Sequence, residues 1–137
     1  MDCIAATNHE LRARQRIASH IARVGNLSLK LTHKSVKVWW KILNAAVFMN
    51  TLPYPKAVTI KTYKAIHAKI VAEDAQNFEL YIHDQFDTRH LFLTVLVHEM
   101  VHVWELVNGH EMSHGKTFKQ WTQHIKTAVG LELTREI

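Results

Sequence analysis

The sequence contains few cysteines, glycines and prolines. Its 137 residues include one cysteine, Cys3, so an internal disulfide and a cysteine-based zinc ribbon are both excluded. There are only four glycines and two prolines, and charged residues make up 21%, which argues against a disordered chain. Because 47% of the residues are hydrophobic, the chain can bury one core, and we expect a single domain over residues 1–137.

The sequence also shows no apolar signal-peptide or membrane-spanning segment. No apolar signal-peptide region follows the first basic residues, and no apolar run approaches the roughly 20 residues needed to span a membrane. Together with the lone cysteine, these features predict a cytoplasmic protein without a membrane partner.

Acidic residues are scarce in the first half of the chain. Residues 1–69 carry twelve Lys and Arg against two acidic residues, a charge of +10, whereas residues 70–137 carry five against ten, a charge of −5. Such a basic half either keeps the surface solvated or binds an anionic partner such as DNA, and the sequence leaves both interpretations open. The candidate nucleic-acid-binding residues are Arg12, Arg16, Lys34, Lys37 and Lys41.

Hydrophobic spacing predicts two helices at the start of the chain. The first is expected over residues 9–24, with Asn8 as its cap. The second is expected over residues 33–49, with the cationic residues outward and Trp39 and Trp40 on its apolar side. Because both tryptophans follow the apolar stripe, we interpret them as core residues rather than as a platform for stacked bases.

A small sheet is expected next. A Leu-Pro break at residues 52–55 ends the second helix. Apolar and polar residues then alternate with a period of two, which predicts three strands with one buried face, at residues 58–63, 66–70 and 78–83. A polar turn is predicted at residues 73–77.

The most informative segment is the H-E-x-x-H pattern formed by His98, Glu99 and His102 inside an apolar run. In a helix the two histidines share one face, with Cβ atoms about 5–6 Å apart, so both imidazoles can bind one Zn²⁺. Glu99 is turned away from that axis and can act as the general base for a water molecule at the metal. A hydrogen-bonded core cluster is the alternative, but a shared metal satisfies all three buried polar groups at once.

The helix that carries this motif has start and stop signals of its own. Asp87 or Thr88 can cap it, and Asn108-Gly109 ends it. A last helix is expected over residues 116–129, after a short loop.

That loop holds the candidates for a third ligand, which a catalytic zinc site requires in addition to an open position. They are His110, Glu111 and His114. His114 is favoured because it lies just before the last helix. His110 follows the end of the motif helix almost at once, which tends to direct its side chain past the last turn.

Two segments of the sequence resemble the SprT-like metalloproteases, a family that includes Spartan. They are His-Glu-Met-Val-His at residues 98–102 and Ser-His-Gly-Lys-Thr-Phe at residues 113–118. The order of the expected elements is similar too, so the resemblance covers about residues 33–130 and leaves residues 1–32 as an N-terminal helical extension.

The resemblance implies an α+β, zincin-like single domain with N-terminal helices, a small three-stranded sheet, a central active-site helix and a C-terminal helix. It implies one Zn²⁺ per chain, with His98, His102 and His114 as ligands and Glu99 as the catalytic residue. The expected activity is that of a zinc-dependent endopeptidase on a protein or peptide substrate lying along a sheet edge. The Spartan branch of the family acts on proteins crosslinked to DNA.

A second hypothesis is a non-catalytic, zinc-containing protein that associates with nucleic acid or serves in an assembly. The histidine ligands fit either hypothesis equally well. Glu99 separates them, because a purely structural zinc site has no need of a general base.

Overall fold

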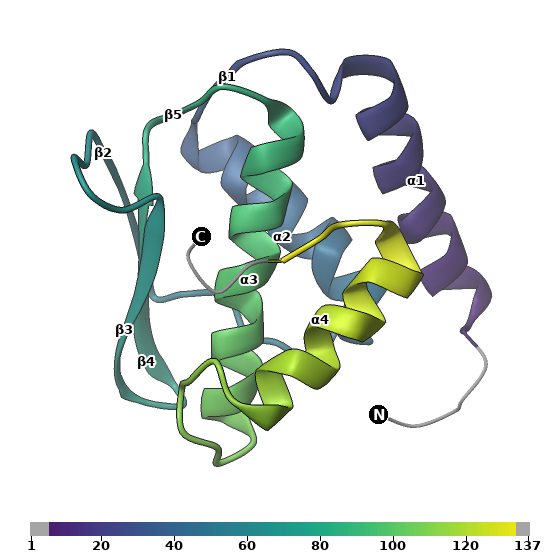
Figure 1. Cartoon of the computed structure of the whole chain (residues 1–137). Coiled ribbons are helices and arrows are strands. Elements are labelled where there is room, and N and C mark those ends of the chain that lie inside the picture. The colour runs from purple at the N-terminus through teal and green to yellow at the C-terminus, as the bar shows by residue number, and fades with distance from the viewer. Residues whose placement is uncertain (1–5, 134–137) are drawn as a thin grey trace.

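The structure is a computed structural model that describes residues 6–133, so Cys3 lies outside the described residues. Within these described residues, four helices pack with a three-stranded sheet, which confirms the α+β class (Figure 1). The helices are α1 (Asn8–Val24), α2 (His33–Val47), α3 (Arg89–Val107) and α4 (Lys116–Val129). The sheet contains β2 (Ala57–Lys61), β3 (Ala68–Asp74) and β4 (Asn77–His83), while β1 (Leu29–Lys30) pairs with β5 (Gln85–Phe86).

The N-terminal helix α1 begins one residue earlier than predicted, at Asn8, because its cap is Thr7 and not Asn8. The Thr7 hydroxyl accepts the Glu10 backbone N–H at 3.1 Å, and the Glu10 carboxylate accepts the Thr7 N–H at 3.3 Å. This reciprocal pair satisfies two backbone donors that a helix start leaves without partners. Ile17 of α1 is fully buried in the same hydrophobic core as the other helices.

Helix α2 ends two residues earlier than the spacing predicts. Met49 and Asn50 adopt positive φ angles of 56° and 59°, which takes the chain out of the helix before the proline-rich segment. Trp40 is buried in the core, whereas Trp39 is half-buried and packs against the His20 ring at 4.3 Å between centroids.

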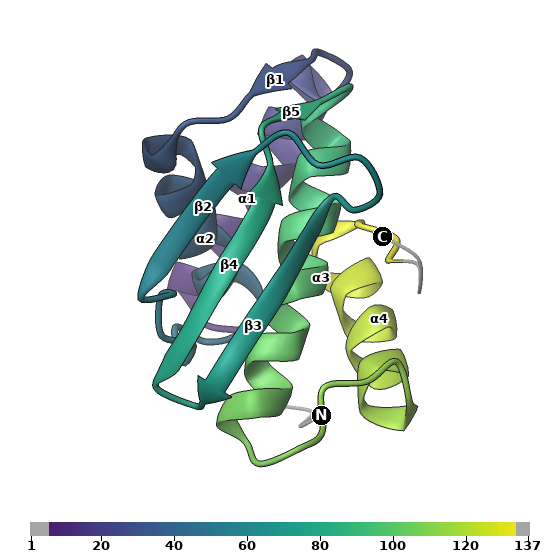
Figure 2. The same ribbon diagram turned by 90° about the vertical axis from the view of Figure 1, so that its left-hand side faces the viewer.

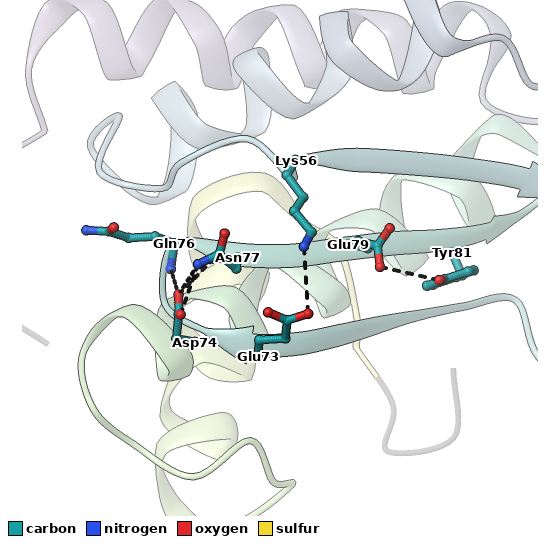
Figure 3. A network of polar contacts seen from close by, with 7 residues as sticks. All are labelled: Lys56, Glu73, Asp74, Gln76, Asn77, Glu79 and Tyr81. Carbon is teal, nitrogen blue, oxygen red and sulfur yellow. Dashed lines mark hydrogen bonds and ion pairs between the residues drawn. The ribbon is translucent and has the colours of Figure 1, made fainter.

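The sheet has the strand order β2-β4-β3, with β2 parallel and β3 antiparallel to β4. Strand β3 starts later and runs longer than the predicted segment, so the predicted turn at residues 73–77 is too wide. The Asp74 carboxylate accepts the backbone N–H groups of Gln76 and Asn77 at 2.8 and 2.9 Å, which closes a turn of two residues (Figure 3). On the solvent face of the sheet, Lys56 and Glu73 form an ion pair at 4.0 Å.

The short β1–β5 ladder was not predicted, because β1 lies in the short connection between the two expected N-terminal helices, where the sequence shows no strand pattern. Each strand contributes two residues, which is too few for a periodic pattern. The ladder ties the connection between α1 and α2 to the residues that lead into α3.

Helix α3 lies between the sheet and the other helices and forms the centre of the core (Figures 1 and 2). Thr88 caps it, with its hydroxyl accepting the Leu91 N–H at 3.0 Å. At 19 residues with a mean hydropathy of 1.3, α3 is long and apolar enough to cross a membrane, contrary to the sequence expectation. Because 67% of this segment is buried inside the domain, that property is weak support for a membrane span.

Candidate metal centre

Two neighbouring elements bring three histidines together. His98 and His102 come from the middle of α3, and His114 comes from the loop that joins α3 to α4. The apolar surroundings of α3 bury His98, which is 4% exposed, while His102 and His114 are half-buried. The centre therefore lies where the core helix meets the surface, so that a metal ion held there remains accessible to solvent on one side.

The spacing of the imidazole nitrogens suits a tetrahedral metal ion. His98 Nε2 lies 3.3 Å from His102 Nε2 and 3.2 Å from His114 Nε2. Ligand nitrogens 2.0–2.1 Å from a tetrahedral zinc are separated by about 3.3 Å along each edge of the tetrahedron. The ligand atoms of all three side chains lie within 4.8 Å of one another, so this group is able to hold one metal ion.

Phe118 of α4 fixes the arrangement of the rings. Its centroid lies 4.9 Å from that of His98, 5.5 Å from that of His102 and 4.7 Å from that of His114. The sequence places Phe118 in the expected last helix, but does not reveal it as a contact of all three imidazoles. Because Phe118 is 3% exposed, its position and therefore the rings' packing are set by the core.

Glu99 follows His98 on α3 and is 5% exposed. Burial raises the pKa of its carboxyl to about 7. A carboxyl group with a pKa near neutrality can both accept and return a proton at the pH of a cell. A cation bound next to it would lower this pKa, because an opposite charge favours the ionised form.

The loop before α4 separates the three candidates for the third ligand. His110 is exposed, and its ring stacks on Trp104 with centroids 5.3 Å apart and does not belong to the three-histidine group. Gly109, with a φ of +75°, turns the chain out of α3. Glu111 is also exposed, so within the described residues only His114 joins His98 and His102.

Glu105 is a residue of the site that the sequence pattern did not reveal. Its Oε1 lies 2.8 Å from Nδ1 of His102, and the side chain is 1% exposed. Burial raises the pKa of the Glu105 carboxyl, an effect opposed by the Ser113 backbone N–H and by His114 and His110. Their spacing in the sequence could have indicated this contact, because His102 and Glu105 are three residues apart and positions i and i+3 of a helix share one face.

The predicted basic residues divide into two groups. Arg12, Arg16 and Lys41 line one groove of about 460 Å³ between α1 and α2, whose floor includes Ala13 and Ile42. The other two cations of α2 do not line this groove. They are Lys34, which is exposed, and Lys37, whose ammonium lies 5.7 Å from the centre of the Tyr54 ring.

A comparison with protein families finds one match, and it covers more than half of the chain. The sequence model described as the SprT-like family matches residues 61–136. The chain belongs to the SprT-like family. No curated protein matches it.

The matched segment of this SprT-like protein starts at the end of β2 and contains α3 and α4. It therefore includes the three histidines, Glu99 and Glu105. The groove between α1 and α2 lies outside it, so family membership says nothing about a role for the basic residues.

Proposed function

We propose that this SprT-like protein is a zinc-dependent endopeptidase with His98, His102 and His114 as the zinc ligands. The observation that carries the proposal is a three-nitrogen group in which His98 is followed on α3 by a buried carboxyl, Glu99, that is not itself part of the group. Structural zinc sites are closed by four protein ligands, whereas catalytic sites have three and keep one position open. Among residues 6–133, no fourth His, Cys, Asp or Glu joins this group.

Zinc bound at this centre would supply Lewis-acid activation of a water molecule and of a peptide carbonyl. Glu99 would take the proton from the attacking water and later give it to the amine of the leaving peptide. The buried position of Glu99 supports this role, since burial raises the pKa of its carboxyl and so opposes the lowering that a bound cation would cause. Phe118 and the α3 backbone would keep the ligand rings in place while the proton moves.

The edge of the sheet suits a polypeptide substrate. Strand β3 pairs only with β4 in the described part of the chain, and it lies alongside α3 (Figure 2). Its other edge therefore offers backbone N–H and C=O groups to an extended peptide, which would add as a further strand through main-chain hydrogen bonds. Recognition of this kind depends little on side chains, so we expect an unfolded protein to be a substrate.

Metal removal tests the proposed endopeptidase. Dialysis against a chelator should abolish cleavage of an unfolded substrate such as labelled casein, and about one equivalent of Zn²⁺ per chain should restore it, because three ligands define one catalytic site. Zinc content is measured by mass spectrometry of the metal, and cleavage by release of labelled peptides. Cleavage that persists in protein shown to be free of metal would contradict the proposal.

We further propose that the groove between α1 and α2 binds the phosphate backbone of DNA. Arg12 and Arg16 of α1 and Lys41 of α2 are exposed and face one groove, although they belong to separate helices. Cations clustered in this way neutralise neighbouring phosphates and release the counterions bound to DNA. Bound DNA would hold proteins attached to it close to this domain.

Charge reversal at this groove should weaken DNA binding. The Arg16→Glu/Lys41→Glu variant should lose affinity for duplex DNA, and the slope of log K against log salt should fall by about two, one for each phosphate that is no longer neutralised. Lys34→Glu/Lys37→Glu is the matched control, with the same change of charge away from the groove. Fluorescence anisotropy at several salt concentrations measures both. Equal losses of affinity in the two variants, or no binding by the wild type at low salt, would contradict a site in the groove.

A further inference from the structure

Glu105 occupies a position that folding alone does not explain. It is an acidic residue of the core helix with 1% exposure, and its Oε2 atom is buried without a hydrogen bond to the described residues. Burying a carboxylate with one oxygen unpaired is unfavourable for the folded state. An apolar residue would fill this position in α3 with less cost, so the carboxylate must serve another purpose.

The other carboxylate oxygen shows what that purpose is. Oε1 of Glu105 lies 2.8 Å from Nδ1 of His102, while Nε2 of the same ring lies 3.3 Å from Nε2 of His98. An ionised carboxylate only accepts hydrogen bonds, so Nδ1 must donate. The proton is then on Nδ1, and the lone pair of Nε2 points at the place where the three histidines meet.

Glu105 also contacts the loop that carries the third histidine. Its backbone carbonyl accepts the His110 N–H at 2.8 Å. The backbone N–H of Ser113, the residue before His114, lowers the pKa of the Glu105 carboxyl and so favours its ionised form. A single buried residue thus connects a ligand on the helix with the loop that brings in another ligand.

We propose that Glu105 is a positioning residue for the metal: its carboxylate holds His102 in the tautomer and orientation that bind a metal through Nε2. A carboxylate bonded to the far nitrogen of a ligand histidine also makes that imidazole a stronger donor to the metal. The inference rests on the proposed metal centre, and it assigns to α3 a further functional side chain beyond the H-E-x-x-H residues.

Two substitutions separate the charge of Glu105 from its hydrogen bond. Glu105→Gln keeps an oxygen that accepts from Nδ1 of His102 but removes the charge, and Glu105→Leu removes both while keeping a similar volume. Loss of such a partner typically weakens metal binding about 10–100-fold. We expect zinc binding to weaken about tenfold for Gln and about 100-fold for Leu. Glu111→Gln, an exposed glutamate in the following loop, is the control and should bind zinc like the wild type.

The readout is the zinc dissociation constant, measured by competition with a chromophoric chelator, together with the melting temperature of each metal-free protein. A positioning role predicts weaker zinc binding with a melting temperature that is unchanged or higher. Unchanged affinity in both variants would overturn the proposal. So would a melting temperature of the metal-free Gln variant that falls along with its affinity, because that result would show a structural role. Failure of the wild type itself to bind zinc would instead overturn the proposed function.

Discussion

Replacing Glu99 with Gln is expected to leave zinc bound and to slow protein cleavage by at least ~10²–10⁴-fold, the usual contribution of a general base. Glu99 is 5% exposed and does not belong to the three-histidine group, so the amide should fit its place without disturbing the ligands. An amide cannot take the proton from water. The defect should therefore appear in the rate of cleavage, measured at equal zinc content.

The control for this experiment is Glu111→Gln, which makes the same chemical change at an exposed position of the neighbouring loop. It should cleave like the wild type. The experiment also separates an endopeptidase from a non-catalytic zinc protein, because the latter needs no general base. Cleavage by the Glu99 variant at a rate comparable to that of the wild type would rule out the proposed mechanism.

Removal of the His114 side chain is expected to have the largest effect on the metal. His114→Ala should weaken zinc binding by more than the ~10–100-fold typical of losing a hydrogen-bond partner of a ligand, because it removes a ligand itself. Cleavage should disappear with the metal. The His114 Nε2 lies 3.2 Å from that of His98, and the side chain sits on a loop, so the substitution leaves the core intact.

His110→Ala provides the matched control, since it removes a histidine of the same loop. That ring stacks on Trp104 and lies outside the three-histidine group, so zinc content should stay close to that of the wild type. Equilibrium dialysis followed by metal analysis compares the two variants directly. If His110→Ala removed the zinc and His114→Ala did not, the ligand assignment would be wrong.

The elements that depend on local pattern could be predicted from the sequence. The start of α3 follows from a capping threonine, and the ends of α3 and α4 follow from glycines with positive φ at residues 109 and 130. The alternation over β2 and β4 also indicated strands. Errors occur where two neighbouring residues can serve the same role or where an element is very short. Thr7, and not its neighbour Asn8, caps α1. The two-residue strands β1 and β5 are too short to show a periodic pattern.

For the site, too, the sequence predicts what local spacing determines but not what depends on tertiary packing. Helical spacing brings His98 and His102 together without any tertiary information. The approach of His114 depends on the conformation of a loop, so the sequence could only favour this residue, from its position just before the last helix and from the resemblance to a family. The sequence could not show that the cations of α1 and Lys41 of α2 share a groove, while Lys34 lies elsewhere, because that depends on how α1 packs on α2.

The most direct test of the metal centre is X-ray absorption spectroscopy at the zinc edge of the loaded wild-type protein. We predict three imidazole nitrogens at about 2.0–2.1 Å and one further oxygen ligand from water. A sulfur ligand at about 2.3 Å would implicate the single cysteine, Cys3. That result, or a closed shell of four protein ligands, would contradict a catalytic centre built from His98, His102 and His114.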